Sequence, residues 1–395
     1  MLRSRLLLLV VLAIGSIFLT AVSYRLPPGL QENPAGSLSP TGCLGEPRAD
    51  HTATLLPDGR VLIAGGMVEN GVFLDSMELY DPRTGSFKPA GTMSSKRVGH
   101  SATLLPSGKV LLAGGMAERS FEGGLHGIMS STADVYDPQT NTVTLAGNMI
   151  TERQAHEAVP LPNGKVLFVG GYDGRHYLDT VEIFDPATNK FALAGKLTEP
   201  RGAAVAVLLP ASDGRDAGKI LVMGGASGES ETNHIVLGSA ELFDPNTGAS
   251  VKVGEMTLRR YKHAATVLAD GRVLITGGSD DRDWGKMFDS AEIYDPSTHR
   301  FMPTSKMISK RFKLPHATVL LKNGKVLVAG GSNVVEVFDN NQKKFLPVNG
   351  SLNAPSYYGT ATLLKDGKVL IVGGYGRAAG ANGPLSGRQA FLYEP

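Results

Sequence analysis

A pair of adjacent glycines that ends an apolar run recurs seven times along this chain of 395 residues. The pairs begin at residues 65, 114, 170, 224, 277, 330 and 373, so successive pairs are 43 to 56 residues apart. A period in this range is typical of proteins built from repeated supersecondary units, each of which buries its apolar faces against its neighbours. The fold is therefore expected to be an array of similar units rather than one irregular core.

Each glycine pair closes a stretch of similar sequence. The stretch from His100 to Gly115 contains a Ser-Gly turn between two apolar runs, and nearly the same pattern occurs at residues 51–66, 156–171, 263–278 and 316–331. Two looser copies end at Gly225 and Gly374. An aromatic residue, an acid and, in most copies, a proline follow each pair, at residues 80–82, 136–138, 184–186, 243–245, 294–296, 338–340 and 393–395.

One unit is predicted to form four β-strands. In the second copy, residues 102–105 alternate only partly, whereas residues 110–113 are continuously apolar, which is typical of a strand buried on both faces. The glycine pair ends the second strand where the backbone needs a positive φ or a close approach. The Asp-Pro corner ends the third strand because proline cannot continue a hydrogen-bonded ladder.

The double glycines, the aromatic-Asp-Pro corners and the Gly-Lys/Arg-Val-Leu turns closely resemble kelch repeats, from residue 37 to residue 395. The resemblance implies an all-β fold, a seven-bladed kelch-type β-propeller in which each sheet covers its neighbours. The chain departs from the common kelch pattern because Phe or Val stands where a tryptophan usually follows the third strand. Kelch propellers carry many unrelated activities, so the resemblance predicts architecture and leaves function open.

The two ends of the chain are predicted to share one blade. The sequence stops after a third strand, and residues 36–44 match residues 85–93, which hold a fourth strand, position by position. We therefore expect the N-terminal strand to complete the C-terminal blade and close the ring, which removes an open sheet edge.

The first residues have a different character. Arg3 and Arg5 precede an uncharged run over residues 6–22, which is typical of a secretory signal and is also close to the shortest span that crosses a bilayer. We expect residues 1–23 to be a signal peptide or a membrane anchor, residues 24–36 a tether, and residues 37–395 the propeller. Either alternative places the propeller outside the cytoplasm, secreted or anchored, with membrane contact only through residues 6–22 if they stay uncleaved.

Charge and cysteine content narrow the range of partners. The 39 basic and 37 acidic residues are nearly balanced and form no basic block, so nucleic acid is not an expected partner. Cys43 is the single cysteine, which rules out an intrachain disulfide and a cysteine-rich metal cage. A monomer without cofactor or metal is expected.

Ligand binding is expected in the loops between the second and third strands. These loops open on the face where the first strands begin, and they vary while the rest of the unit repeats. The candidate ligand-binding residues on this loop face are Arg119, His126, Arg175, His176, Tyr177, Asp281, Arg282, Trp284, Tyr375 and Arg377. Trp284, the single tryptophan, either contacts a sugar or peptide or folds back over its own blade.

A recurrent Arg-x-x-His pattern precedes the first strand, as in Arg48/His51 and Arg97/His100. Histidines in a ring suggest metal binding, but copies at the same position of adjacent blades are a whole blade apart, so a structural role in turns at the innermost strand is expected. In the sixth copy, Lys313 is interpreted as the residue at the arginine position.

The function favoured by the sequence is an extracytoplasmic binding or interaction module whose partner is a protein or a cell-surface glycan. The alternative is a carbohydrate-acting enzyme, such as a kelch protein that isomerises sugars or acts like a mutarotase. No catalytic residue is assigned, because the chain lacks the Gly-x-Ser-x-Gly, HExxH and phosphate-loop motifs.

Copper-radical sugar oxidases such as galactose oxidase also contain a kelch-like seven-bladed ring, and the chain is distantly similar to that domain. The resemblance implies a tyrosine cross-linked to cysteine, a second tyrosine beside a histidine, and a further histidine. Cys43 lies on the predicted closing strand and no Tyr-His dipeptide occurs, so the copper site of these oxidases is not expected here.

Overall fold

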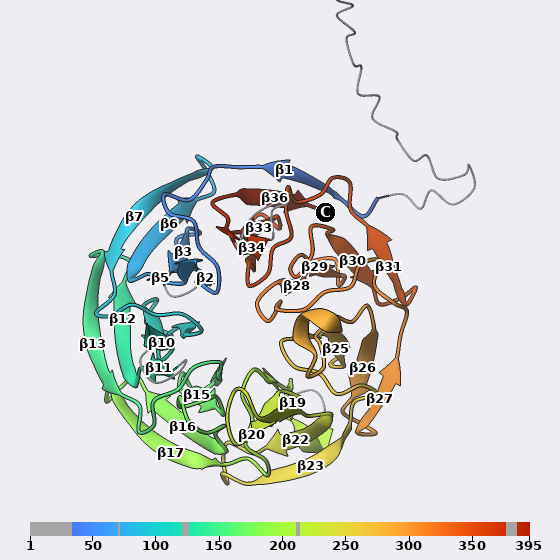
Figure 1. Cartoon of the computed structure of the whole chain (residues 1–395). Coiled ribbons are helices and arrows are strands. Elements are labelled where there is room, and N and C mark those ends of the chain that lie inside the picture. Colours follow the sequence, from blue (N-terminus) through green and yellow to red (C-terminus); the bar gives the residue numbers. More distant parts are fainter. Residues whose placement is uncertain (1–33, 70–71, 121–125, 211–213, 377–384) are drawn as a thin grey trace, which may run out of the picture. The chain divides into compact units, whose positions relative to one another are not determined.

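Seven four-stranded antiparallel sheets are arranged around a central axis (Figure 1). This computed structural model describes residues 34–69, 72–120, 126–210, 214–376 and 385–395. The described helical segments are two single 3-10 turns, η1 (Gly214–Asp216) and η2 (Asp283–Gly285). The predicted all-β, seven-bladed propeller is confirmed. Within the described residues, no helix has the length and apolar character needed to cross a membrane, and the predicted signal or anchor lies outside them.

The blades follow one another along the chain, with the first strand innermost and the fourth outermost. Blade one contains β2 (Thr52–Leu55), β3 (Val61–Ala64), β6 (Ser76–Asp81) and β7 (Ser86–Thr92). Blade two contains β8 (Ser101–Leu104), β9 (Val110–Ala113), β12 (Thr132–Asp137) and β13 (Thr142–Asn148). Blade three contains β14 (Glu157–Pro160), β15 (Val166–Val169), β16 (Thr180–Asp185) and β17 (Lys190–Lys196). Blade four contains β18 (Val205–Leu208), β19 (Ile220–Met223), β22 (Ser239–Phe243) and β23 (Ser250–Glu255).

The remaining blades complete the circle. Blade five contains β24 (Ala264–Val267), β25 (Val273–Thr276), β26 (Ala291–Asp295) and β27 (Arg300–Pro303). Blade six contains β28 (Thr318–Leu320), β29 (Val326–Val328), β30 (Glu336–Asp339) and β31 (Lys344–Pro347). Blade seven contains β32 (Thr360–Leu363), β33 (Val369–Val372), β36 (Ala390–Glu394) and β1 (Ser37–Pro40).

Short hairpins occupy several loops between second and third strands. They are β4 (Met67–Glu69) with β5 (Val72–Phe73), β10 (Met116–Ser120) with β11 (His126–Met129), β20 (Ala226–Gly228) with β21 (His234–Val236), and β34 (Tyr375–Gly376) with β35 (Leu385–Ser386). Isolated bridges, such as Ala49 to Met67 and Tyr357 to Tyr375, join these loops to the segments that lead into the first strands. The loops and the starts of the first strands therefore share one face, as the sequence predicted.

The second strands form the most buried layer of the molecule. Every residue of β3, β9, β15, β19, β25, β29 and β33 is buried. Their side chains pack against those of adjacent blades, as where Leu62 of blade one and Leu112 of blade two lie in one apolar cluster. Burial on both faces explains why these strands have no polar alternation.

The glycine pairs lie where neighbouring blades approach most closely. Gly65 and Gly66 have φ of +61° and +93°, and a Cβ on Gly65 would stand 2.7 Å from the carbonyl oxygen of Arg97 in the next blade. The N–H of Gly66 donates to that same carbonyl at 2.8 Å. All seven pairs make this bond to the next blade, over 2.8–3.0 Å, so the glycines allow a contact that any side chain would block.

The ring closes as predicted. β1 pairs antiparallel with β36, in the register Ser37 to Glu394 and Pro40 to Phe391 (Figure 1). The Tyr393 hydroxyl also donates to the carbonyl of Ala35 at 2.6 Å. The N-terminal strand therefore supplies the outermost strand of the C-terminal blade.

Candidate functional site

One residue of each blade, shortly before the first strand, has a left-handed backbone conformation, with φ between +49° and +61°. The backbone N–H of six of these residues donates to the carbonyl of the equivalent residue in the preceding blade, at 2.7–3.2 Å. We call this set the axial ring, and its members are Asp50, Gly99, Ala155, Ala203, Lys262, Lys313 and Tyr358. The ring is a rigid support, because these bonds connect each backbone to at least one neighbour.

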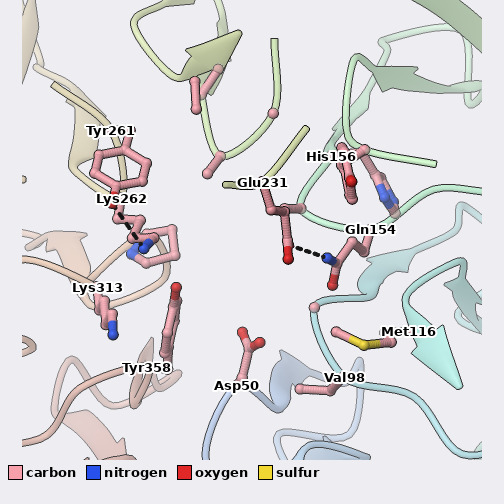
Figure 2. Close-up of a pocket in the computed structure, with 18 of the residues that line it drawn as sticks. Asp50, Val98, Met116, Gln154, His156, Glu231, Tyr261, Lys262, Lys313 and Tyr358 are labelled. Carbon is pink, nitrogen blue, oxygen red and sulfur yellow. Dashed lines mark hydrogen bonds between the residues drawn. The ribbon is translucent and has the colours of Figure 1, made fainter. Parts of the chain in front are cut away.

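The axial ring lines a cavity of about 560 Å³ on the loop face, which we call the axial cavity (Figure 2). This volume lies within the range of about 300–1,000 Å³ that is usual for small-molecule sites. Blades two, three and four contribute the glycine and alanine members of the ring, whereas blades five, six, seven and one contribute the lysines, the tyrosine and the aspartate. The small half leaves room for a ligand, and the other half supplies charge.

Aromatic rings from three blades follow one another along the wall above the small half. The ring centroids of Tyr172 and Tyr177 are 5.1 Å apart, those of Tyr177 and His234 are 6.3 Å apart, and those of His234 and Tyr261 are 5.7 Å apart. All four residues line the axial cavity, and we call them the aromatic wall. Burial raises the pKa of Tyr177, so its hydroxyl is neutral and available as a hydrogen-bond donor.

Polar groups complete the wall. The Gln154 side-chain amide donates to the Glu231 carboxylate at 3.1 Å, across the loops of blades three and four (Figure 2). Asp50 lies on the opposite side of the cavity (Figure 2). Burial raises the pKa of Asp50 to about 6, although Lys313 and Lys262 act in the opposite direction.

The two lysines of the axial ring share one carboxylate. The Lys262 ammonium donates to Asp283 at 2.9 Å, and the Lys313 ammonium lies 3.6 Å from the other oxygen of that carboxylate. Burial, and then the like charge of Lys262, lower the pKa of Lys313 to about 8. Burial alone would raise the pKa of Asp283, but the two ammonium groups hold it below its usual value.

The structure brings only part of the predicted site together. Tyr177, Asp281 and Tyr375 line the axial cavity. The residues outside its lining are Arg175, His176, Arg282 and Trp284. The side chains of Arg119 and His126, on β10 and β11, and the whole of Arg377 lie outside the described residues.

The loop residues outside the lining have other contacts. Arg175 and His176 follow Asp173, whose carboxylate accepts both of their backbone N–H groups at 2.7 and 2.6 Å. Arg282 forms an ion pair with Asp280, and its side chain is 60% exposed. These contacts build the loops locally.

Trp284 folds back, but over its neighbours rather than over its own blade. Its ring centroid lies 4.7 Å from that of Phe312 and 4.8 Å from that of Tyr357, which precede the first strands of blades six and seven. The Lys313 ammonium lies 4.4 Å from the Trp284 ring centroid. Trp284 therefore helps to hold Lys313 in a box of aromatic rings.

The Arg-x-x-His residues are structural, with partners that differ from the predicted ones. Each buried arginine bonds the carbonyl of its blade's first paired glycine and an acid on the third strand, as Arg48 does with Gly65 at 2.8 Å and Glu78 at 2.9 Å. In blade six this arginine is Arg311, which corrects the interpretation of Lys313. Three of the histidines, His51, His100 and His156, bond the first strand of the neighbouring blade instead of a turn. Burial lowers the pKa of His51 and His156 to about 3.

Sequence reasoning missed the axial ring and most of the aromatic wall. A usable signal was the residue immediately before the histidine in blades one, two, three and five, since this position holds Asp, Gly, Ala or Lys while its neighbours repeat. The acids that pair with the arginines also carried a signal: in blades one to six an acid stands two residues before the aromatic residue of the corner.

Comparison with solved structures identifies the same architecture in a fungal alcohol oxidase of the AA5 family, determined in complex with copper. The match has a TM-score of 0.68 and 16% sequence identity, and it covers 91% of this chain and 76% of that one. At this identity the likeness shows the fold alone.

The residues of this chain do not fit the copper site of radical oxidases described above. Cys43 is exposed, just after the closing strand β1. In the described residues, no group of three or more His, Cys, Asp or Glu side chains is arranged to hold a metal ion. We therefore derive no step that involves copper.

The sequence comparisons agree with the fold. The Kelch motif matches residues 47–94, 158–198 and 260–308, which correspond to blades one, three and five. No curated protein matches the chain. With seven blades in one register and kelch motifs at three of them, the chain is a kelch-repeat β-propeller.

Proposed function

We propose that this chain is an extracytoplasmic binding protein that takes a saccharide into the axial cavity. The observation that carries the proposal is the aromatic wall, which faces the same cavity as the amide and carboxylate pair of Gln154 and Glu231. Aromatic rings cover the apolar faces of a sugar, and fixed amides and carboxylates bind its hydroxyl groups. The glycan would belong to a cell surface or to a glycosylated partner.

The proposed location is supported by the sequence of the first residues, with two arginines before the apolar run 6–22. Cell fractionation of the full chain tests it: the propeller should be found in the medium or on the outer side of a membrane, accessible to added protease. A chain that begins at residue 34 should stay in the cytoplasm. Cytoplasmic full-length protein would contradict the location and leave the cavity proposal standing.

A bulky substitution in the small half of the axial ring tests whether the saccharide binds in the axial cavity. Ala203→Tyr places a tyrosine at a position that Tyr358 already occupies in blade seven, with φ of +49° and +52°, so the fold should accept it. Titration calorimetry with glucose, galactose, mannose, N-acetylglucosamine, glucosamine and glucuronic acid should show binding by the wild type and a loss of at least tenfold in the variant.

The matched control is Leu193→Tyr, on the outer strand β17, where the side chain is 56% exposed and far from the axis. This variant should bind as the wild type does. Equal binding by Ala203→Tyr and wild type would place the saccharide elsewhere. Binding of a protein partner with no response to any saccharide would favour the protein ligand, and conversion of a sugar during incubation would favour the carbohydrate-acting enzyme.

A further inference from the structure

Three junctions between neighbouring blades are sealed by one repeated hydrogen bond beside the axis. His100 bonds the hydroxyl of Thr52 at 3.1 Å, His156 bonds that of Ser101 at 2.9 Å, and His51 bonds that of Thr360 at 3.1 Å. In each case a histidine before the first strand meets the first residue of the preceding blade's first strand. One ring nitrogen of each histidine and the hydroxyl group at each junction are therefore paired within the protein.

The imidazole also fills a defined space. At four junctions, its Cε1 atom lies 2.8–2.9 Å from where a Cβ would stand on the first paired glycine of the preceding blade: Gly65, Gly114, Gly224 and Gly373. The first paired glycine of blade three, Gly170, has no imidazole among its nearest neighbours, because Ala204 stands where blades one, two, three and five have histidine. In the described part of the chain the same is true of Gly277 and Gly330, so the junction between blades three and four is one of three that lack this imidazole.

Glu157 stands at this junction where the sealed ones have serine or threonine. Both Glu157 and Ala204 line the axial cavity. No hydrogen bond or ion pair is recorded for the Glu157 carboxyl in the described part of the chain. Two departures from the repeat, a large acid and a missing imidazole, therefore meet at one junction, where a carboxyl group lines the cavity.

The surroundings of Glu157 decide which form of the carboxyl is present. Burial raises its pKa to about 8, and no basic group contributes to the shift. The adjacent His156 is neutral, because burial lowers its pKa to about 3. A neutral carboxylic acid both donates and accepts a hydrogen bond, which is the pattern that a sugar hydroxyl group also offers. A half-buried carboxyl group without a hydrogen-bond partner in the described part of the chain gains most from a ligand that completes its hydrogen bonds.

We propose that Glu157 anchors one end of the bound saccharide at the junction of blades three and four. Its carboxyl group donates a hydrogen bond to an uncharged hydroxyl group of the sugar and accepts a hydrogen bond from another. This proposal rests on the proposed function, since it places a group of the same ligand against another residue of the same cavity. The proposal predicts that the site prefers a sugar whose hydroxyl groups are uncharged at this end over a sugar that carries an ammonium group or a carboxylate there.

The experiment compares Glu157→Gln, Glu157→Ala and the double variant Glu157→Ser/Ala204→His. Glutamine keeps one donor and one acceptor in the same shape, alanine removes both, and the double variant rebuilds the sealed junction that Ser101 and His156 form. Affinity for the neutral sugars of the panel above should change less than about threefold in Glu157→Gln and fall about 10- to 100-fold in the other two.

Thermal unfolding of each variant distinguishes a defect in folding from a defect in binding. The double variant should melt at or above the wild-type temperature, since it copies a junction already present in this molecule, and its loss of affinity then reflects the site. Glucosamine should bind more weakly than its neutral counterparts, because its ammonium cannot accept from the acid.

The outcomes separate the two proposals. Wild-type affinity in both Glu157→Ala and the double variant, together with lost binding in Ala203→Tyr, would overturn the anchor and keep the cavity as the binding site. Tighter binding of glucosamine that Glu157→Gln abolishes would also overturn the neutral anchor. Absence of binding by the wild type to every sugar of the panel would overturn both proposals.

Discussion

Six buried arginines connect the strands of their own blades to the neighbouring blades. The side chains of Arg48, Arg97, Arg153, Arg201, Arg260 and Arg311 are fully buried, each against a carboxylate on the third strand of its blade. The backbone carbonyl of each also accepts the glycine N–H of the preceding blade. A charge buried in this way is stable only while its partner and its backbone acceptors are in place.

Removing one arginine should therefore cost far more than removing a surface ion pair. Arg260→Leu leaves Glu292 buried without its partner, and we expect the free energy of unfolding to fall by about 3–5 kcal/mol. The control is Arg272→Leu, whose pair with Asp270 is partly exposed and should contribute about 0–1 kcal/mol. Urea unfolding of both variants measures the difference, and equal losses would show that the buried pair contributes no more than the surface pair.

The buried histidines predict how stability depends on pH. His263 is fully buried, neither ring nitrogen has a hydrogen-bond partner in the described part of the chain, and burial lowers its pKa to about 3. Because the unfolded chain binds a proton near pH 6.5 and the folded chain does not, stability from this residue is present above that pH and is lost as the pH falls. Stability should thus decrease steadily on acidification.

His263→Leu should make the protein less sensitive to acid. At pH 5.5 the wild type should lose about 1.4 kcal/mol more than the variant, relative to pH 8, because one residue with an unfolded pKa near 6.5 has been removed. The measurement is urea unfolding at both pH values. A variant that loses the same stability as the wild type would show that His263 is protonated in the folded state.

Single residues also mark where sequence reasoning failed. Lys313 was assigned to the arginine position because it lies three residues before His316, whereas the structure uses Arg311. The segment from the arginine to the histidine is two residues longer in blade six than in blades one, two, three and five. Counting three residues back from the histidine therefore gave the wrong residue. The packing of Trp284 against aromatic residues of blades six and seven depends on contacts between segments far apart in the chain, which no local pattern reveals.

At the scale of strands, the sequence was sufficient. Period, continuous apolar runs and glycine pairs predicted four strands in each blade, because these signals arise from burial and backbone geometry within one repeat. The closing strand β1 was predictable for a further reason: its sequence matches a complete fourth strand elsewhere in the chain. Pairing at a distance could be inferred only because the repeat supplied a template.

Strand β1 should contribute strongly to stability. It supplies the hydrogen bonds of one edge of blade seven, and Leu38 packs in the apolar cluster that joins blades six and seven. Deletion of residues up to 44 should lower the melting temperature sharply, whereas a chain that begins at residue 34 should melt as the full propeller does. Differential scanning calorimetry of the two proteins decides, and equal melting temperatures would mean that blade seven is stable without its outer strand.

At the scale of the whole molecule, the seven repeated blades form the scaffold, and residues that differ from blade to blade line the axial cavity. The axial cavity combines residues of all seven blades, so its lining is spread over the sequence from Asp50 to Tyr375. Variation among the loops predicted ligand binding on the face where this cavity opens, and three of the predicted residues line the cavity. It did not predict the axial ring, because only closure of the circle brings the ring residues together.

Because pairing of the two ends closes the ring, we predict that the chain can be opened in another blade and its present ends joined. Ser37 pairs with Glu394 in an antiparallel ladder, so a short turn can join Pro395 to Pro34 without moving either strand. New ends between Thr188 and Asn189, in the exposed turn between β16 and β17, would give blade three the arrangement that blade seven has now. We expect this circular permutant to fold, to melt within a few degrees of the wild type and to retain the saccharide affinity of the axial cavity. A permutant opened between Leu111 and Leu112, inside the buried strand β9, is the control and should fail to fold. If both permutants fail, the ring depends on the native order of its blades as well as on their mutual packing.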